Sequence, residues 1–453
     1  MSRSTVCAAA LLGLGLSPLA AAPASAASVL LISIDALSPD YVTKADALGL
    51  KVPNLRRFLT EGSYAQGVRG VVPTITCPSH ATLVTGVTPS KHGIYGNDPL
   101  KTDGYSAALC TFAGDVKADA LYDAAARAGI ESGSVGWLNT AGATTVKYNL
   151  PHVEPYQSEI TVKYQEAMAT PPGLLTELEG KLGSYHQDGT EAGSEIRTRF
   201  AAEIMRRYKP GFMMFHIIAV DHAAHAHGPW SEEAKKAVEH EDAMIGQIIQ
   251  AALANDPDTI IAVTSDHGQA PITRALNLRI ALVEAGLIEL EPLVPGRAVK
   301  VKDAKAQVIT GASAAIRLKD PSDAVTRAKV SQLLHALGAD PQNGIDRIVE
   351  GAEVERLGGY AGASFVVGMK PGTVVGGAYF GEKLVDLPAV AGTHGYLPDQ
   401  PTMNASFFVR GKGIKPGHNL GVVEMTRIAP TLAQALGVKL QDADQPPLPI
   451  FSR

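Results

Sequence analysis

The sequence predicts an α/β protein with a doubly wound, mostly parallel central sheet and helices on both faces. Short apolar segments that end abruptly in polar residues occur at 28–35, 132–139, 211–221 and 258–268. Their hydrophobicity is continuous rather than alternating, which is typical of parallel strands buried on both faces. Between them, apolar residues three and four apart indicate helices at 52–61, 117–127, 195–207 and 231–254. Strands alternating with helices favour the doubly wound sheet.

The pattern changes between residues 277 and 384. Strand-like segments at 306–318 and 363–380 flank a helical pattern over 323–337. The tail then returns to the earlier style, with a strand in "ASFFVRG" and a helix in "MTRIAPTLAQALG" that Gly437 closes. We therefore expect one catalytic domain over 27–453, interrupted by a smaller α+β insertion at about 277–384.

Residues 1–26 have the features of a cleaved signal peptide. Arg3 precedes an apolar run, and Ala24-Ser25-Ala26 ends the segment. We expect an exported protein, periplasmic or secreted. No later stretch approaches ~20 apolar residues, so no stable membrane insertion is expected. The net charge of −5 and the absence of a dense Lys/Arg run argue against binding to a nucleic-acid duplex. The oligomeric state does not follow from the sequence.

Acidic and histidine residues follow the predicted strands. Asp35, Asp221 and Asp266 each stand near the end of an apolar segment, where open α/β sheets bind their ligands. His225 lies four residues after Asp221, which puts both on one side of a helical turn. His267 follows Asp266 directly. A polar turn or a helix N-cap would explain each pattern singly.

His394 completes this set from a glycine-flanked turn, "AGTHGYLPD". Carboxylates and imidazoles are both ligands of Zn²⁺. Two Asp-His pairs, one further Asp and one further His fit two metal ions, and two ions about 4 Å apart suit displacement at phosphorus.

The segment "VPTITCPSH" offers the nucleophile that such a site needs. It holds Thr74, Thr76, Cys77 and Ser79, and Pro78 is suited to the first turn of a following helix. A helix N-terminus favours a phosphoryl oxygen. Local geometry does not separate Thr74 from Thr76, because strand alternation puts both on one face.

These motifs together resemble a known family. "SIDAL", "VVPTITCPSHATLVTGVTPSKHGIYGN", "VDHAAHAHGP", "TSDHGQ" and "GTHGY" occur in this order. They are similar to the nucleotide pyrophosphatase/phosphodiesterase (type I phosphodiesterase) family of the alkaline phosphatase superfamily, which implies an alkaline-phosphatase-like core and two Zn²⁺ ions.

The resemblance also implies roles for individual residues. Thr76 would be the nucleophile and would bridge toward phosphate. One zinc would be held by Asp221, His225 and His394, and the other by Asp35, Asp266 and His267. Asn97 would be catalytic and substrate-binding, through a hydrogen bond to a non-bridging phosphate oxygen.

One departure concerns the residue after the nucleophile. Family members that cleave nucleotides usually carry an aromatic residue there, and this chain has Cys77. A thiol offers no π-face for stacking on a base. Cys77 is still expected to lie in the substrate-binding region, and Tyr148 and Tyr156 are candidates for the missing stacking surface. Cys77 and Cys110 could also form a disulfide, if their Cα atoms come within bonding range.

The expected function is zinc-dependent hydrolysis of a small phosphodiester or pyrophosphate substrate through a covalent phospho-threonine. A phosphomonoesterase (alkaline phosphatase) would share the metals but add a basic residue, which the sequence does not identify. A phosphonate hydrolase of the same superfamily is a further alternative. A sulfatase-type formylglycine needs C-x-P-x-R, whereas this chain reads Cys77-Pro78-Ser79-His80. From a different class, the chain could be a non-catalytic zinc- or phosphate-binding exported protein.

Overall fold

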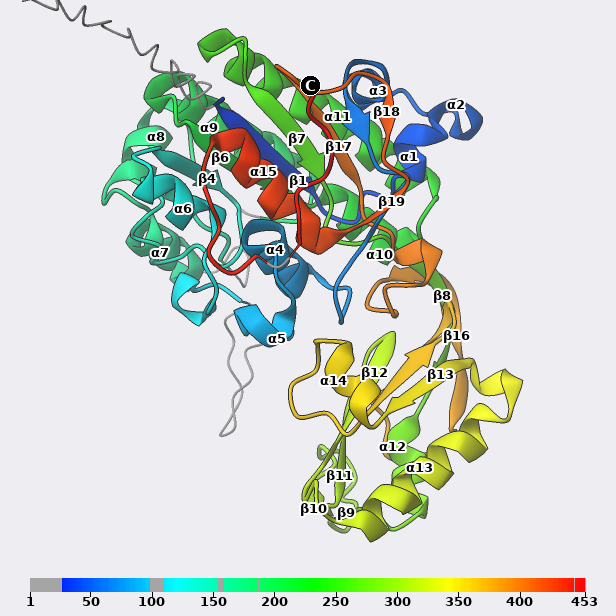
Figure 1. The fold of residues 1–453 in the computed structure, drawn as a ribbon. Coiled ribbons are helices and arrows are strands. Elements are labelled where there is room, and N and C mark those ends of the chain that lie inside the picture. Colours follow the sequence, from blue (N-terminus) through cyan, green and yellow to red (C-terminus); the bar gives the residue numbers. More distant parts are fainter. Residues whose placement is uncertain (1–26, 98–109, 154–158, 186–187, 444, 453) are drawn as a thin grey trace, which may run out of the picture.

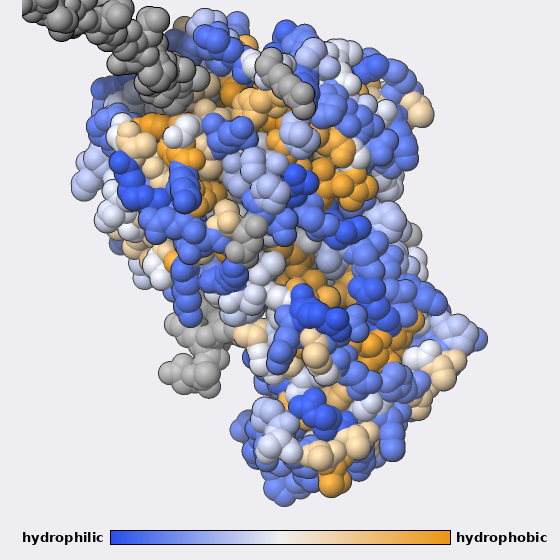
Figure 2. All heavy atoms as spheres, in the orientation of Figure 1, coloured by the Kyte–Doolittle hydropathy of each residue, from blue (hydrophilic) through white to orange (hydrophobic). Residues whose placement is uncertain are grey.

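The computed structural model describes residues 27–97, 110–153, 159–185, 188–443 and 445–452. The predicted signal peptide and Tyr156 lie outside these residues. The described chain forms a large lobe and a small lobe, which β8 and β16 connect (Figure 1). On the face drawn in Figure 2, hydrophilic residues cover most of both lobes.

The large lobe is built on an eight-stranded sheet with the strand order β18-β2-β17-β7-β1-β6-β4-β5. Parallel pairing joins β7, β1, β6, β4 and β5, whereas β17 runs antiparallel to β7 and β2. The strands are β1 (Val29–Ile34), β2 (Ser63–Tyr64), β4 (Ser132–Val135), β5 (Tyr148–Leu150), β6 (Phe212–Ile217), β7 (Ile260–Thr264), β17 (Phe407–Arg410) and β18 (His418–Asn419).

Both faces of the sheet are buried under helices. Alternate residues of β1 enter two different cores: Leu30 and Ile32 pack into one, Val29 and Leu31 into the other. The first core is covered by α3 (Pro53–Glu61), α9 (Glu191–Tyr208) and α11 (Glu232–Asn255). The second is covered by α4 (Thr76–Thr85), α6 (Leu121–Arg127) and α15 (Ile428–Leu436). The predicted α/β class, with a mostly parallel sheet between two helical layers, is confirmed, and the continuous hydrophobicity has its cause in this double burial.

The small lobe has its own core. A four-stranded antiparallel sheet in the order β11-β12-β14-β13 packs with α12 and α13 around residues such as Ile316, Val330 and Phe365. Its elements are α12 (Leu278–Glu284), β9 (Ile288–Leu290), β10 (Val301–Ala304), β11 (Ala306–Ile309), β12 (Ser313–Leu318), α13 (Ala324–Gly338), β13 (Ile345–Glu350), α14 (Ala352–Arg356) and β14 (Phe365–Met369). A second sheet, β15-β8-β16, forms its base with β8 (Ala270–Leu276), β15 (Gly372–Val375) and β16 (Leu384–Thr393).

The remaining elements lie on the large lobe, where β3 pairs with β19. They are α1 (Asp40–Thr43), α2 (Ala45–Leu48), β3 (Gly67–Arg69), α5 (Pro89–His92), α7 (Glu159–Met168), α8 (Leu174–Leu182), α10 (Ala219–His227) and β19 (Val422–Glu424). The helix α15 ends at Gly437, whose φ of 67° is the left-handed conformation expected of a C-cap glycine. Within the described part of the chain, none of the helices combines the length and apolar character that crossing a bilayer requires.

We predict that Leu31→Ala destabilises the large lobe by about 2–5 kcal/mol, because Leu31 is fully buried and its removal leaves a cavity. Urea denaturation followed by tryptophan fluorescence measures the change. The matched control is Leu293→Ala, since Leu293 is 55% exposed and its loss is expected to cost less than about 0.5 kcal/mol. Equal effects of the two substitutions would contradict the assignment of β1 to the core.

Candidate active site

The site lies at the carboxyl edge of the parallel strands. Asp35 follows β1 directly, and its backbone N–H donates to Ile217 O at the end of β6 at 2.9 Å. Asp266 and His267 come just after β7, which pairs in parallel with β1. Strand β6 ends at Ile217, so Asp221 lies in the first turn of α10 rather than at the strand end. Parallel pairing therefore brings residues far apart in sequence to one edge.

One cluster of ligand-type side chains consists of Asp35, Asp266 and His267, all of which are buried. His267 Nε2 lies 3.5 Å from Asp35 Oδ1 and 3.2 Å from Asp266 Oδ2. Asp266 Oδ1 accepts hydrogen bonds from the backbone N–H groups of Ala36 and His267, both at 3.1 Å. The other carboxylate oxygen, Oδ2, therefore faces His267 Nε2 within the cluster.

The second cluster consists of Asp221, His225 and His394. Asp221 Oδ1 lies 3.3 Å from His225 Nε2 and 3.8 Å from His394 Nε2. The rings of His267 and His394 stack with centroids 3.7 Å apart, so the two clusters adjoin. In each cluster, the candidate ligand atoms lie within 4.8 Å of one another.

The base of the small lobe holds the two clusters together. The chain enters that lobe through β8 just after His267 and returns through β16 just before His394. Ala270 of β8 pairs antiparallel with Thr393 of β16. His267 and His394 therefore lie close together where the chain enters and leaves the small lobe. The long insertion is therefore compatible with two neighbouring ligands.

The donor atoms of both clusters fit divalent metal ions. In the first cluster, Asp35 Oδ1 and Asp266 Oδ2 are buried and have no hydrogen-bond partner among the described residues. In the second cluster, the Nε2 atoms of His225 and His394 both face Asp221 Oδ1. Burial, and next the charges of Asp266 and Asp221, hold the pKa of Asp35 well above its usual range. Buried carboxylates that face one another without a counter-charge are costly, and a bound cation removes that cost. Carboxylate with imidazole is also a donor set that zinc accepts.

Contacts behind the ligands orient them. His225 Nδ1 lies 2.8 Å from Gly392 O, and His267 Nδ1 lies 3.1 Å from Gly268 O. An Nδ1–H donated to a carbonyl leaves Nε2 as the free acceptor for a metal. Gly392 permits this contact because a Cβ there would lie 2.3 Å from Ala224 O. Gln269 Nε2 donates to Asp221 Oδ1.

Thr76 is the first residue of α4, and Pro78 lies in the first turn of that helix. Thr76 Oγ1 is 3.5 Å from His267 Nε2. It lines a cavity of about 240 Å³ together with Asp35, Asn97, Asp221, His225 and His394. Thr74, by contrast, is buried and donates its hydroxyl to Tyr396 O at 2.6 Å. The tertiary structure thus separates the two threonines that local geometry left equivalent.

Asn97 lies next to Thr76. Its Oδ1 accepts the backbone N–H of Cys77 at 3.0 Å, which commits the oxygen and leaves the amide N–H groups as donors. Asn97 lines the same cavity as Thr76.

The structure does not place the side chains of Cys77 and Tyr148 in this cavity. Cys77 is fully buried and forms a disulfide with Cys110, at a Cα–Cα distance of 6.0 Å. Its thiol is therefore unavailable for the predicted substrate contact. Tyr148 stacks on Tyr208 with centroids 4.2 Å apart and donates its hydroxyl to Glu131.

Several buried groups around the site have roles that the sequence did not indicate. His216 Nε2 lies 3.3 Å from Asp35 Oδ2, and its Nδ1 contacts Gly136 O at 3.1 Å. His80 Nδ1 contacts Thr76 O, and Nε2 contacts Ser33 Oγ, both at 2.9 Å. The spacing of four between Thr76 and His80 was a helical signal that could have linked them.

Two further buried charged side chains, Arg197 and Glu241, contact backbone groups near the site. Arg197 Nη1 donates to His216 O at 3.3 Å, from a side chain that is fully buried. Glu241 accepts hydrogen bonds from Ser194 Oγ at 2.6 Å and from the backbone N–H of Ala219 at 3.1 Å. Ala219 is the first residue of α10, so Glu241 caps the helix that carries Asp221 and His225.

The mostly parallel sheet between two helical layers, with two clusters of metal-ligand-type side chains at its carboxyl edge, is an alkaline-phosphatase-like fold. Residues 29–397 match the family model described as type I phosphodiesterase / nucleotide pyrophosphatase, and the chain belongs to that family. The family is metal-dependent, in agreement with the two ligand clusters.

Individual relatives are distant. The chain is 23% identical to mouse ectonucleotide pyrophosphatase/phosphodiesterase family member 1 over 248 residues, which cover 53% of this chain and 24% of that protein. It is 23% identical to the bis(5'-adenosyl)-triphosphatase ENPP4 of Pongo abelii over 278 residues, 58% of this chain and 53% of that protein. The matches thus span about a quarter to a half of these relatives.

Solved structures share the fold. Human ectonucleotide pyrophosphatase/phosphodiesterase 5 superposes with a TM-score of 0.62 at 19% identity, covering 91% of this chain and 95% of that one. An inactive Thr-to-Ala variant of the murine protein in complex with AMP has a TM-score of 0.61 at 18% identity, with 91% and 96% coverage.

Glu241 generates a prediction on pH. Burial raises its pKa from 4.5 to about 7, so the folded protein holds a proton that the unfolded chain releases between these values. The resulting stabilisation is complete below pH 4.5 and is lost as the pH rises through 7; it amounts to about 3 kcal/mol. Glu241→Gln removes this component, because its amide does not titrate.

Urea denaturation between pH 4.5 and 7.5 measures the free energy of unfolding of wild type and variant. Taking the difference between the two proteins cancels the contribution of other titrating groups. Glu233→Gln, at an exposed position of the same helix, is the control and should follow the wild type. Parallel pH profiles for wild type and Glu241→Gln would refute the prediction.

Proposed function

We propose that this protein is a zinc-dependent hydrolase of phosphodiester or pyrophosphate bonds that acts through a covalent phospho-Thr76 intermediate. The observation that carries the proposal is the position of the Thr76 hydroxyl, at the N-terminus of α4 and 3.5 Å from His267 Nε2, beside two clusters of carboxylate and imidazole ligands.

The ligand sets follow from the two clusters. Asp35, Asp266 and His267 would hold one Zn²⁺, with Thr76 at its open side, and Asp221, His225 and His394 would hold the other. When bound, the ions lower the pKa of a hydroxyl group or a water molecule and neutralise charge on phosphate oxygens.

The chain's own groups position the reaction. Thr76 Oγ forms a bond to phosphorus while the bond to the leaving oxygen breaks, and water later cleaves the phospho-threonine. For a phosphodiester, the net reaction consumes one water and yields a monoester and an alcohol; for a pyrophosphate bond, it consumes one water and yields two phosphate-bearing products. Charge that grows on the non-bridging oxygens meets the free N–H groups at the start of α4 and the amide of Asn97.

The substrate is a small molecule. Several relatives are named as nucleotide pyrophosphatases or as a bis(5'-adenosyl)-triphosphatase, so nucleotides with a pyrophosphate bond are one class to test. The position after Thr76 carries a disulfide-bonded cysteine and no aromatic ring, which favours substrates that do not depend on stacking against that residue. We further propose that the protein is exported, since the first 26 residues have the pattern of a signal peptide.

We predict that Thr76→Ala lowers kcat for bis-para-nitrophenyl phosphate by on the order of 10³ or more, because it removes the nucleophile. Metal content, measured by mass spectrometry of the purified protein, should stay at the wild-type value. The control is Thr74→Val, which removes a structural hydroxyl bonded to Tyr396 O and should leave kcat within about tenfold.

Turnover by Thr76→Ala would exclude the covalent route. Faster wild-type hydrolysis of para-nitrophenyl phosphate than of the diester would instead favour the phosphomonoesterase alternative. If the protein with both zinc ions bound hydrolyses no diester, the alternative of a non-catalytic zinc- or phosphate-binding protein is favoured.

Asn97→Asp gives a second prediction. It keeps the oxygen that accepts the Cys77 N–H, but it replaces the amide donor with a carboxylate near the transferred phosphoryl group. We expect kcat/KM for the diester to fall by about 10²–10³, with unchanged zinc content and thermal unfolding temperature. Steady-state kinetics on both proteins test this, and an Asn97→Asp enzyme of wild-type efficiency would remove Asn97 from the catalytic groups.

A further inference from the structure

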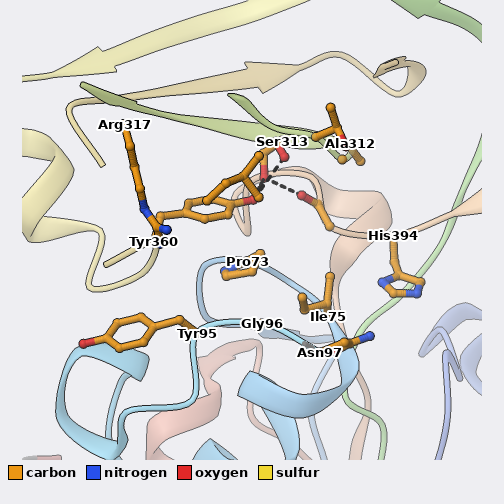
Figure 3. Close-up of a pocket in the computed structure, with 14 residues that line it drawn as sticks. Pro73, Ile75, Tyr95, Gly96, Asn97, Ala312, Ser313, Arg317, Tyr360 and His394 are labelled. Carbon is orange, nitrogen blue, oxygen red and sulfur yellow. Dashed lines mark hydrogen bonds between the residues drawn. The ribbon is translucent and has the colours of Figure 1, made fainter. Parts of the chain in front are cut away.

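A second cavity joins the catalytic site to the small lobe (Figure 3). It has a volume of about 350 Å³ and shares Asn97 and His394 with the cavity around Thr76. Ile75 and Tyr95 line it from the large lobe, and Arg317 and Tyr360 line it from the small lobe. A substrate held at Thr76 can therefore extend into a space that both lobes build.

The charge of this cavity comes from Arg317. None of its described lining residues is acidic. Arg317 lies on β12, and its Nε donates to Ala361 O at 2.9 Å. Among the described residues, no carboxylate pairs with its guanidinium group, and partial burial alone lowers its pKa. A guanidinium that is partly desolvated without a counter-charge is suited to binding an oxyanion.

Hydrogen bonds fix β12 relative to the catalytic site. Ser313, at the start of β12, donates its hydroxyl to Gly395 O at 2.5 Å, and Tyr360 Oη donates to Ser313 O at 3.0 Å. Gly395 is the neighbour of the candidate ligand His394. Residues 313 and 317 lie on the same face of the strand, and Figure 3 shows the Arg317 side chain extending beside Tyr360 toward the turn with Tyr95.

We propose that Arg317 forms an oxyanion subsite in the small lobe, which selects phosphodiester or pyrophosphate substrates with a second anionic group, a carboxylate or a phosphate, away from the scissile phosphorus. The cavity is at the small end of ligand pockets, so the group that carries this charge is compact. The inference rests on the proposed function, because it assigns a subsite to the same reaction.

Matched synthetic diesters test this subsite. Methyl para-carboxyphenyl phosphate and its para-carbamoyl analogue differ by one charge on the leaving group. Para-nitrophenyl carboxyethyl phosphate and its carbamoylethyl analogue differ by one charge on the retained group, and a phosphonoethyl analogue replaces the carboxylate by a phosphorus oxyanion. For each pair, the measured quantity is the ratio of kcat/KM for the charged and the neutral substrate.

We expect Arg317→Gln to lower this ratio about 10- to 100-fold relative to wild type in one of the two pairs. A lower ratio of kcat/KM in the first pair places the subsite on the leaving-group side. A lower ratio in the second pair places it on the side of the retained group. A larger loss for the phosphonate than for the carboxylate identifies a phosphate as the preferred group. Arg317→Lys should recover part of the ratio, because it keeps the charge without the planar fork.

Arg279→Gln is the control. Arg279 belongs to the same lobe but does not line the cavity next to the catalytic site; it lines another cavity, of about 470 Å³, to which Arg317 also contributes. Loss of Arg279 should change the ratios less than about twofold. Unchanged ratios in Arg317→Gln, or an equal loss in Arg279→Gln, would overturn the inference.

The proposed function is judged separately, by wild-type hydrolysis of the neutral diesters. If the wild type cleaves the neutral diesters but Arg317→Gln shows unchanged ratios, only the proposed subsite is refuted. If the wild type cleaves none of the diesters, both the proposed function and the proposed subsite are refuted. Thermal unfolding of each variant excludes a folding defect as the cause.

Discussion

Three carboxylates gathered at one edge of a sheet, two of them buried and Asp221 partly buried, are the constraint on which the rest of this structure depends. Asp35, Asp221 and Asp266 lie close together, and each of them contacts at least one histidine. Isolated charges in such a place cost far more than a single domain's stability allows, so they need cations or protons. The oriented imidazoles and the unbonded carboxylate oxygens make divalent cations the suitable partner. Much of the surrounding structure serves to hold this edge: Glu241 caps α10, His216 contacts Asp35, and Gly392 admits the close approach of His225.

The small lobe is part of the candidate active site. It leaves the sheet after His267 and returns at His394, and the pairing of β8 with β16 brings these two residues into ring contact. The small lobe also contacts the turn that carries His394, since Ser313 donates its hydroxyl to Gly395 O and Tyr360 donates to Ser313 O. The lobe thus contributes both to the position of a candidate ligand and to the lining of the neighbouring cavity.

Cys77 shows how a disulfide fixes the residue next to Thr76. Cys77 turns inward and joins Cys110, and its backbone N–H is held by Asn97. The disulfide thus ties the first turn of α4 to Cys110. Cys77 therefore contributes to the packing of α4 and to the fixed position of Thr76.

The sequence by itself determined the strands, the main helices and the candidate ligands, because these depend on local signals. Continuous apolar runs predict doubly buried strands, and a spacing of four predicts that Asp221 and His225 share a helix face. It also yielded the motif order that identifies the family. The tertiary structure decided what depends on contacts between distant segments. It separated Thr76 from Thr74, since only the packing of Tyr396 shows that the Thr74 hydroxyl is engaged. It directed Cys77 and Tyr148 away from the cavity and set Arg317 beside the catalytic site, more than two hundred residues after Thr76. No periodicity encodes such contacts, because strand pairing and lobe docking bring them together only in the folded chain.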